Sequence, residues 1–471
     1  MQIFEDEVVG DIWNPMADAG ARYARMRVLW SYIEPVKVTP PVRNWTVMDE
    51  LLGGLAAAGF TPIGEVFGHP DWAATEPCGP IDLVPLSRYG DFIEALVERY
   101  DGDGTGDAAG SPRIAHWEIG NEADFDSDHA GGESSYGSCF GGKAEDYGAY
   151  LREAYLAAKR ADSTATVLFG GVAYDRFYNK SGYSPAGPFD YRFVGDVLDW
   201  LYAHHGSEAE WPFFDWMAVH VYNDFRNAWD GTQPYDQELI GKTLHFRTNQ
   251  LLSVGDYDLR AMPLAVSESS LPSMPSDDWT VRSEDIQAAY PGRLLARSMK
   301  AGVEPTIWYT VEDYTGGDCD ELYDWLGFGV LRSLDVYEAA QDCSPNPIPG
   351  YSVSADHEPK PAHTAYSVAA DQLDGAAFDA QVVTAHPELE AYRFEESGGG
   401  YMIVTFTDNG ERLGRRGYPP VVRQMTLNAS NLPGWTGTVA ITDYLGNTTY
   451  RSGGSFVNID VTQWPVYVRP Y

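Results

Sequence analysis

Strand-like and helix-like segments alternate along most of this chain, and the alternation limits the possible fold more than any other feature. Eight apolar runs typical of buried strands are separated by helical patterns. The runs lie at 1–4, 22–30, 61–67, 114–122, 166–172, 213–222, 264–268 and 306–311. Eight such units predict an α/β fold, a (β/α)8 TIM barrel with its active-site residues at the C-terminal ends of the strands.

The helical patterns between these runs have the lengths expected of barrel helices. They lie at 47–58, 87–100, 144–161, 193–204, 237–253 and 284–301. The first helical pattern begins near Asp11, so that Met1–Phe4 resembles the stub of a strand. The start of the chain therefore looks truncated, and the loss of a leader is left open.

The pattern changes after Leu373. Short β-rich runs at 401–406, 438–443 and 456–461 are separated by Gly, Asn and Asp turns, which is typical of an antiparallel sandwich. We therefore expect a barrel over 1–373 and a small C-terminal β-sandwich domain over 374–471. The sandwich is expected to brace the barrel, although Trp435 and Trp464 leave a carbohydrate-binding module open.

Charge restricts the partners of the chain. Its 471 residues include 32 basic and 69 acidic side chains, which gives a net charge of −37. A field of that sign repels nucleic acid and anionic membranes, so neither is an expected partner. The sequence has no run of roughly 20 apolar residues, as a membrane helix needs. It indicates no oligomeric state.

Two glutamates each close an apolar run. The segment Arg113–Glu122 reads RIAHWEIGNE, and Pro263–Glu268 reads PLAVSE. Cleavage of a glycosidic bond needs one carboxyl group that protonates the leaving oxygen and another that attacks or stabilises the sugar carbon. Glu122 and Glu268 are candidates for these roles, and the Asn121 amide is placed to bind the sugar 2-hydroxyl. A lone Asn-Glu would more often cap the next helix, but its pairing with Glu268 favours catalysis.

Several motifs resemble glycoside hydrolase clan A, and most closely family 39, in their order along the chain. They are AGARYARMRVLW at 19–30 with EP at 34–35, FGHPDWA at 67–73, WEIGNE at 117–122, FFDWMAVHVY at 213–222, Glu268 at the seventh strand and PKPAHTAYSVAADQL at 359–373. The resemblance implies that Glu122 is the acid/base and Glu268 the nucleophile of a retaining mechanism without a cofactor. Their carboxyl groups should then lie roughly 5–5.5 Å apart.

The resemblance also assigns a donor to the nucleophile. Arg25 occupies the position of the arginine on the second strand of the family, where it would keep Glu268 ionised. Arg27 has the same strand parity and would point the same way. The presence of two such arginines departs from the family pattern, so the sequence leaves open which of them reaches Glu268. Glu118 also faces the lumen, where it is expected to pair with a buried arginine.

Aromatic residues and histidines supply the remaining substrate-binding candidates. His220 and Tyr222 share strand parity and could both face a sugar, with a core histidine as the alternative for His220. Trp308 on the eighth strand fits a platform for a pyranose face, with core packing as its alternative. His69 and Trp72 are candidates on the loop after the third strand.

A structural calcium ion is suggested by the acidic segment YDGDGTGDAAG at 100–110. Asp101, Asp103, Thr105 and Asp107 have the alternating spacing of the first half of a calcium loop. The twelfth position is Pro112 rather than a bidentate glutamate, so a solvated acidic turn is the alternative. The loop precedes the fourth strand and should lie at the end of the barrel remote from catalysis.

Four cysteines fall in loops after predicted strands. We expect Cys78 to pair with Cys139, which lie after adjacent strands, and Cys319 with Cys343, which share one long loop. Four reduced thiols are the alternative. The bridges favour a secreted or extracellular protein. The N-terminal residues MQIFEDEVVG lack the features of a signal peptide, and a cytoplasmic location is the alternative.

These observations predict a retaining glycosidase, similar to β-xylosidases or endo-glycanases, that acts on an oligo- or polysaccharide. The alternative from another class is an inactive barrel that binds a glycan. A metal-dependent barrel hydrolase would need a His-x-His pair near the first strand, which the sequence at 1–4 lacks. Subsite loops decide the sugar, the linkage and the choice between exo and endo action, and the sequence does not indicate them.

Overall fold

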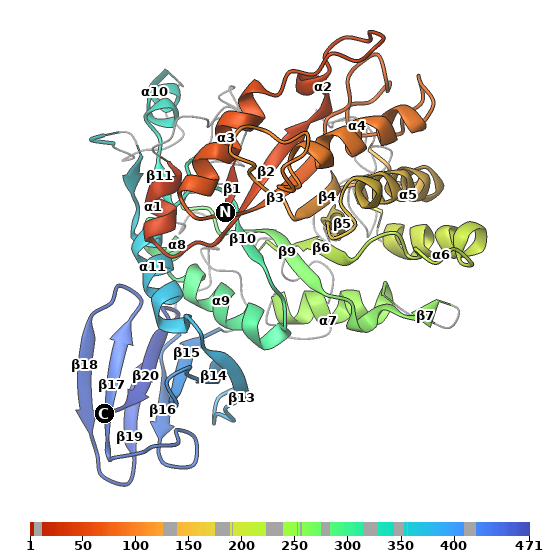
Figure 1. Ribbon diagram of the computed structural model, residues 1–471. Coiled ribbons are helices and arrows are strands. Elements are labelled where there is room, and N and C mark those ends of the chain that lie inside the picture. The colour runs from red at the N-terminus through yellow and green to blue at the C-terminus, as the bar shows by residue number, and fades with distance from the viewer. Residues whose placement is uncertain are drawn as a thin grey trace.

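The chain forms a barrel lobe and a smaller β lobe (Figure 1). The computed structural model describes residues 1–3, 12–125, 139–174, 189–190, 192–222, 239–251, 253–254, 257–274, 283–313, 327–342, 353–355, 357–408 and 421–471.

The barrel lobe is built on one sheet of eight parallel strands. In spatial order they are β1 (Gln2–Ile3), β2 (Tyr23–Leu29), β3 (Thr61–Phe67), β4 (His116–Asn121), β5 (Thr166–Val172), β6 (Trp216–His220), β9 (Leu264–Ser269) and β10 (Thr306–Trp308). Each next strand in the sheet pairs in parallel with the one before it. The sheet curves into a nearly closed barrel, which confirms the predicted TIM-barrel fold.

Helices surround the sheet because each has one apolar face. The main ones are α1 (Trp13–Asp18), α3 (Thr46–Ala57), α4 (Ser87–Arg99), α5 (Ala144–Ala161), α6 (Phe193–His205), α7 (Leu239–Asn249), α9 (Tyr290–Ala301) and α11 (Pro361–Leu373). In α4 the buried residues Tyr89, Phe92, Ile93, Leu96 and Val97 follow the helical period. Helix α9 ends at Gly302, whose φ of 62° suits a left-handed helix terminus.

Shorter elements lie in the connections. They are α2 (Trp30–Ile33), the β7 (Ser253–Val254) and β8 (Tyr257–Asp258) pair, η2 (Leu259–Ala261), α8 (Glu284–Gln287), α10 (Leu334–Asp342) and the β11 (Leu331–Arg332) and β12 (Glu358–Pro359) pair. The single helix predicted at 284–301 is two helices, α8 and α9. The break falls at Ala288–Ala289, just before Pro291, which has no N–H to continue a preceding helix.

The β lobe is an antiparallel sandwich, as predicted. Its larger sheet has the order β13 (Ala377–Gln381), β14 (Leu389–Glu395), β15 (Tyr401–Thr407), β20 (Val466–Pro470), β17 (Thr438–Asp443) and β18 (Thr448–Ser452). The second sheet pairs β16 (Arg423–Leu427) with β19 (Val457–Val461). Side chains alternate along β14: Leu389 and Ala391 enter the core shared with β16 and β19, whereas Tyr392 and Phe394 pack toward α9 and α11.

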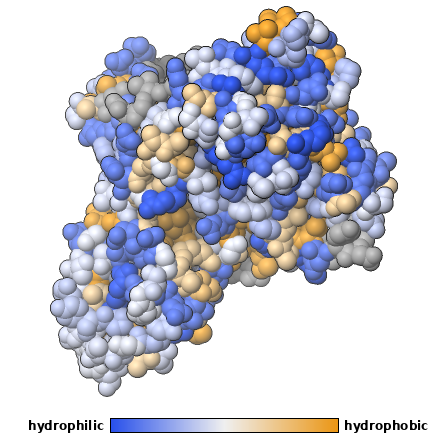
Figure 2. Space-filling model, viewed as in Figure 1, coloured by the Kyte–Doolittle hydropathy of each residue, from blue (hydrophilic) through white to orange (hydrophobic). Residues whose placement is uncertain are grey.

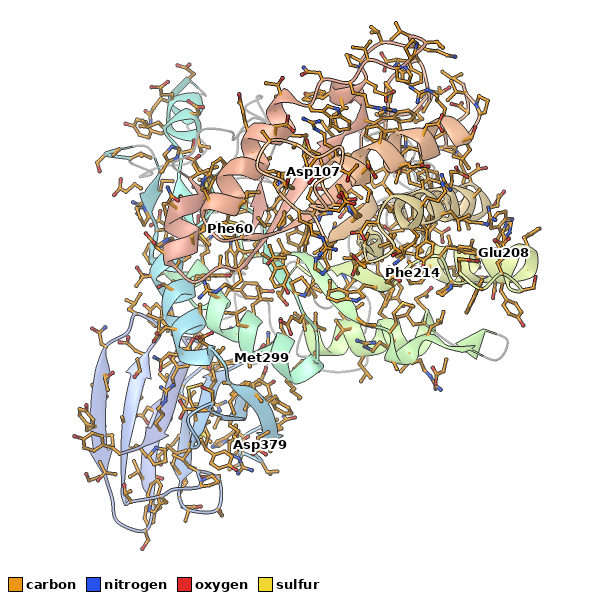
Figure 3. The ribbon with its side chains drawn as sticks, viewed as in Figure 1. Phe60, Asp107, Glu208, Phe214, Met299 and Asp379 are labelled. Atoms are coloured by element: carbon orange, nitrogen blue, oxygen red, sulfur yellow. A yellow bond between two sulfur atoms is a disulfide. The ribbon has the colours of Figure 1, made fainter. Side chains whose placement is uncertain are left out.

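The two lobes meet at α9 and α11, which lie between barrel and sandwich in Figure 1. Hydrophobic side chains gather in the waist between the lobes, while the outer surface is mostly hydrophilic (Figure 2). Figure 3 labels Met299 on α9, which packs against the interface core. Two buried arginines of α9 add ion pairs: Arg297 donates to Glu390 at 2.6 and 3.0 Å, and Arg293 to Asp408 at 2.6 Å. Arg297 also pairs with Asp408.

No helix in the described part of the chain is both long enough and apolar enough to cross a bilayer.

Candidate active site

Strand ends bring the two glutamates together. Glu122 directly follows β4, and Glu268 lies near the end of β9. Pairing between β6 and β9 sets His220 opposite Glu268, and pairing between β4 and β5 sets Asn121 opposite Gly171. These side chains share the C-terminal end of the barrel, the end at which active sites of this fold lie.

The backbone turns sharply at Glu122. Its φ is 43°, and the φ of Gly120, two residues earlier, is 87°. The Glu122 N–H donates to Gly171 O at 2.7 Å, which fixes the turn against β5. A non-glycine residue in this conformation costs on the order of 1–3 kcal/mol and is typical of functional sites. The turn leaves the Glu122 side chain 31% exposed, so it can reach a substrate.

His220 lies between the two carboxylates. Its Nδ1 is 2.9 Å from Glu122 Oε1 and 3.6 Å from Glu268 Oε2. One ligand-type atom from each of the three residues lies within 4.8 Å of the other two. Burial disfavours the charged ring, but the carboxylates of Glu268 and Glu122 outweigh it and raise the pKa of His220.

Glu268 is held as a carboxylate. Arg25 Nη1 donates to its Oε1 at 2.7 Å, and the Tyr222 hydroxyl donates to its Oε2 at 2.6 Å. Burial alone would raise the pKa of Glu268. The charges of His220 and Arg25 and the hydrogen bond from Tyr222 overcome that effect, and the pKa is lowered. An ionised carboxylate of this kind is suited to nucleophilic attack.

Arg25, and not Arg27, is the arginine that contacts Glu268. Arg25 is fully buried and contacts it, whereas Arg27 is 24% exposed and lies 3.9 Å from Glu65. Arg25 Nη2 also donates to Asn121 Oδ1 at 2.7 Å. Since the guanidinium can only donate, this contact fixes the orientation of the amide. The predicted contact of the Asn121 amide nitrogen with a substrate hydroxyl stays a prediction.

Glu118 is the buried partner of Arg25 that the sequence predicted. It accepts from Arg25 Nε at 2.8 Å, from Gly171 N at 2.7 Å and from Ser267 Oγ at 3.1 Å. Gly171 makes this close packing possible. A Cβ at that position would lie 2.4 Å from His220 Nε2 and 2.7 Å from Glu118 Oε1, so any side chain would displace the site.

The donor set of Glu122, His220 and Glu268 also resembles a metal site in its spacing. However, the Arg25 guanidinium lies 2.7 Å from Glu268 and already neutralises it. A divalent cation would face that positive charge at short range. The arrangement therefore suits proton transfer and nucleophilic attack better than metal binding.

The aromatic surface of the site differs from the prediction. Trp308 was expected as a sugar platform, but it is only 1% exposed and donates from Nε1 to Phe328 O at 3.0 Å. It is a core residue, which was the alternative for it. The next residue, Tyr309, is partly exposed, and its ring lies 6.2 Å from that of Tyr222 and 5.9 Å from that of Phe328. Tyr309 and Phe328 were not singled out from the sequence.

His69 and Trp72 make structural contacts within the loop after β3, and their role in binding a substrate stays a prediction. His69 is buried among aromatic rings, 5.5 Å from Tyr150 and 6.2 Å from Trp30, and burial lowers its pKa to about 4. Trp72 packs edge-on against Trp30 at 5.1 Å and donates to Glu34 O. These contacts stabilise the loop after β3, and no contact described for either residue joins it to the glutamate pair.

Asp124 was missed by the sequence reasoning. It is buried and accepts from Ala173 N at 3.1 Å and from Tyr174 N at 2.8 Å, which ties the turn after Glu122 to the end of β5. Burial raises the pKa of Asp124 to about 7 despite these two donors. Its position two residues after Glu122 was the only signal in the sequence.

Cys78 and Cys139 form a disulfide across 61 residues. The bridge joins the loop after β3 to the loop after β4. Next to Cys139, Phe140 N donates to Ala123 O at 3.1 Å, which connects the bridge to the Glu122 turn. Cys319 and Cys343 lie outside the described residues, so their pairing stays a prediction.

The acidic segment forms a compact loop after α4. Oxygen atoms of Asp101, Asp103 and Asp107 lie within 4.8 Å of one another, and Thr105 N donates to Asp103 Oδ1 at 2.7 Å. Figure 3 labels Asp107 in this loop. Burial and then the neighbouring acids raise the pKa of Asp101. This crowding of carboxyl groups fits a cation, which stays a prediction.

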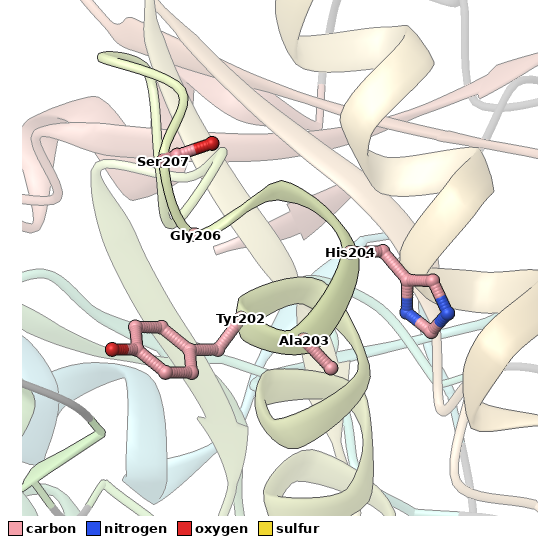
Figure 4. Close-up of a pocket in the computed structure, with 5 residues that line it drawn as sticks. All are labelled: Tyr202, Ala203, His204, Gly206 and Ser207. Carbon is pink, nitrogen blue, oxygen red and sulfur yellow. The ribbon is translucent and has the colours of Figure 1, made fainter.

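A surface hollow of about 390 Å³ lies at the C-terminal end of α6 (Figure 4). It is lined by Tyr202, Ala203, His204, Gly206 and Ser207. Because α6 runs from the end of β5 back to the start of β6, this hollow lies at the end of the barrel opposite to the glutamates. It is not part of the site.

Comparisons with known proteins agree on the fold. No family model matches the sequence, and no curated protein matches it significantly. The solved structures that are similar to it include several glycoside hydrolases, among them family 39 enzymes. The resemblance to family 39 is thereby confirmed at the level of the fold.

Several of these structures cover the whole chain. A family 39 glycoside hydrolase from Bacteroides cellulosilyticus WH2 is similar with a TM-score of 0.63 and 16% identity, over 100% of this chain and 80% of that one. A monomeric β-xylosidase from Caulobacter crescentus CB15 has a TM-score of 0.61 and 16% identity, over 100% and 96%. A family 30 endoxylanase from Clostridium papyrosolvens C71 has a TM-score of 0.52 and 10% identity, over 98% and 92%.

Proposed function

We propose that the protein is a retaining glycoside hydrolase that cleaves an O-glycosidic bond of an oligo- or polysaccharide. The observation that carries the proposal is the separation of the two glutamates. One carboxylate oxygen of Glu122 and one of Glu268 lie within 4.8 Å. Retaining enzymes hold their carboxyl groups roughly 5–5.5 Å apart, whereas inverting enzymes need roughly 6.5–9.5 Å to admit a water molecule.

The surroundings of the two carboxyl groups fit different roles. Glu268, held ionised by Arg25, His220 and Tyr222, attacks the anomeric carbon and forms a glycosyl ester. Glu122, which is more exposed, donates its proton to the departing oxygen. Glu122 then takes a proton from water, and the water displaces Glu268 from the sugar. Two displacements return the original anomeric configuration.

Neighbouring groups support the sugar in this mechanism. The Asn121 amide nitrogen, oriented by Arg25, is placed to bind a 2-hydroxyl, a contact that strengthens in the transition state. The partly exposed Tyr309 ring offers an apolar surface for a sugar face. Since the neighbouring structures include a β-xylosidase and an endoxylanase, we propose a xylose-containing β-glycan as the substrate class.

Removing each glutamate tests the roles. Glu268→Ala should abolish hydrolysis of every glycoside, because no covalent intermediate can form. Glu122→Ala should lower hydrolysis of natural glycosides by roughly 10²–10⁴-fold, the usual contribution of acid–base catalysis. On an activated aryl β-glycoside the first step should persist in Glu122→Ala. Azide should then restore turnover and yield a β-glycosyl azide, identified by NMR.

Glu94→Ala is the matched control, because Glu94 lies on α4 in an exposed ion pair with Arg160. It should retain wild-type activity. Intact hydrolysis of natural glycosides by Glu122→Ala, or a product of inverted configuration, would contradict the assignment. A wild-type chain that binds xylo-oligosaccharides yet turns over no aryl glycoside would favour the inactive barrel instead.

A further inference from the structure

One arginine, Arg25, forms ion pairs with three buried carboxyl groups at the centre of the barrel. Arg25 lies 3.2 Å from Glu65, 2.8 Å from Glu118 and 2.7 Å from Glu268. The side chains of Arg25, Glu65 and Glu118 are 0% exposed, and that of Glu268 is 7% exposed. Water therefore contributes little to balancing charge here, and the carboxylates depend on their contacts with the protein.

Charges in this cluster do not balance. Among the described residues, the cations that face it are Arg25, Arg27 and, when protonated, His220. The Met1 amine also lies near Arg25, but burial and then the charge of Arg25 lower its pKa to about 5. The acids are Glu65, Glu118, Glu268 and Glu122. His220 pairs with Glu122 at 2.9 Å, and Glu122 is itself the proton donor of the proposed mechanism. The three buried carboxyl groups of Glu65, Glu118 and Glu268 then meet two arginines. A buried charge without a counter-charge is costly, so one carboxyl group is expected to hold a proton.

Hydrogen-bond donors identify which buried carboxyl group this is. Glu118 receives donors from Arg25, Gly171 and Ser267 at 2.7–3.1 Å, and Glu268 receives donors from Arg25 and Tyr222 at 2.6–2.7 Å. The contacts of Glu65 are longer: 3.2 Å to Arg25, 3.5 Å to Gln2 Nε2 and 3.9 Å to Arg27. Glu65 is thus the least stabilised as an anion.

The pKa shifts of Glu65 and Glu268 agree with this order of stabilisation by hydrogen bonds. Burial raises the pKa of Glu65 to about 7, even though Arg25 and Arg27 lower it, and Glu118 and Glu268 raise it further. The pKa of Glu268 is lowered. The pKa values of Glu65 and Glu268, two of the three acids that share Arg25, are therefore driven apart, so that Glu65 stays neutral while Glu268 is ionised.

We propose that Glu65 is a positioning residue that acts on the nucleophile through Arg25. While Glu65 holds a proton, the positive charge of Arg25 stabilises the carboxylates of Glu118 and Glu268. Once Glu65 loses the proton, it competes with Glu268 for the guanidinium and loosens the contact that holds the nucleophile. The inference rests on the proposed function. It predicts that activity falls at alkaline pH because Glu65 ionises, in addition to any fall caused by ionisation of the acid/base Glu122.

Thermal unfolding tests the proton without any substrate. The folded-state pKa of Glu65 is raised from 4.5 to about 7, so folding takes up a proton between these values. The resulting stability is complete below pH 4.5 and is lost as pH rises through about 7. Glu65→Gln keeps the size of the side chain but cannot ionise. The melting temperature of Glu65→Gln should therefore rise relative to wild type between pH 4.5 and 8. The difference between Glu94→Gln and wild type should stay constant, and a constant difference for Glu65→Gln would overturn the proposal.

Kinetics test the positioning role. In a Glu122→Ala background the acid/base cannot produce the alkaline limb of kcat/KM on 4-nitrophenyl β-xyloside. The contribution of Glu65 to that limb should lie near pH 7 in Glu122→Ala and be lost in Glu122→Ala/Glu65→Gln, whereas the contribution of His220 stays in both variants. An unchanged limb would overturn the inference.

Arg27→Met provides a second variant if Glu65→Gln does not fold. It removes a cation that lowers the pKa of Glu65, so in the same background it should move the alkaline limb to higher pH. An alkaline limb of kcat/KM that stays at the same pH or moves to lower pH would contradict the role of Glu65. If even the wild type turns over no glycoside, the proposed function and the positioning role both fail, whereas the melting experiment still reports the proton.

Discussion

Tyr222 shows how single contacts separate the roles of two chemically identical side chains. Its hydroxyl donates to Glu268, and its ring packs against Tyr309 and Phe328. The hydrogen bond favours the ionised form of Glu268, while Glu122 has no such donor among the described tyrosines. Environment, rather than residue type, therefore distinguishes nucleophile from acid.

Tyr222→Phe should weaken the nucleophile. Loss of one hydrogen bond to a charged group costs about 1.5–3 kcal/mol, which corresponds to a fall of roughly 10–100-fold in kcat/KM. Because the bond lowers the pKa of Glu268, its removal should move the acid limb of the pH profile to higher pH. Tyr32→Phe is the control, since Tyr32 is 61% exposed. An unmoved acid limb in Tyr222→Phe would contradict this account.

The sequence located the glutamates because both close strands, but it could not resolve every contact. Arg25 and Arg27 have equal parity, and only the three-dimensional packing shows which of them contacts Glu268. The sequence could not show which face of β10 carries Trp308, because the register with β9 shifts between Thr306 and Trp308, where the alternation of faces is lost. Trp308 consequently lies in the core, and Tyr309 lines the site.

Among the connecting elements, the disulfide of Cys78 and Cys139 links two loops at the catalytic end of the barrel. Cys78→Ser/Cys139→Ser should lose about 2–4 kcal/mol of stability, measured by denaturant unfolding. Activity should fall as well, because Phe140 holds the turn that carries Glu122. Reductant should lower the melting temperature of the wild type more than that of the variant. Equal stability of the two proteins would contradict the prediction.

The loop after α4 provides a test of calcium binding. An ion that binds the folded loop should raise the melting temperature as free calcium increases. Asp103→Asn/Asp107→Asn should abolish the response, whereas Asp18→Asn, on the exposed face of α1, should preserve it. A wild-type melting curve that responds to neither chelator nor millimolar-scale calcium would leave a solvated acidic turn.

Long elements were predictable, and the two-residue strands in the connections were not. Helix α5 spans 144–161, as the apolar pattern indicates, because eighteen residues contain several helical turns. The strands β7, β8, β11 and β12 have two residues each and form only where the barrel brings their partners together. No local pattern in the sequence specifies such pairs.

In the molecule as a whole, buried ion pairs join the two lobes. Arg297→Ala would leave Glu390 without its guanidinium in a buried interface, which should cost about 3–5 kcal/mol in the free energy of unfolding. The control is Arg393→Ala, because Arg393 pairs with Asp379 on the outer part of the sandwich and its loss should cost about 1 kcal/mol or less. Equal costs for the two substitutions would argue against the interface as a stabilising element.

The strands β14, β15 and β20 of the larger sheet have both faces covered, one by β16 and β19 and the other by α9 and α11. This arrangement matters to anyone who wishes to shorten the protein. A truncation after α11 would uncover the sides of α9 and α11 that now pack on Tyr392, Phe394 and Phe406. A minimal barrel would therefore need new polar residues on those helices before it could be produced without aggregation.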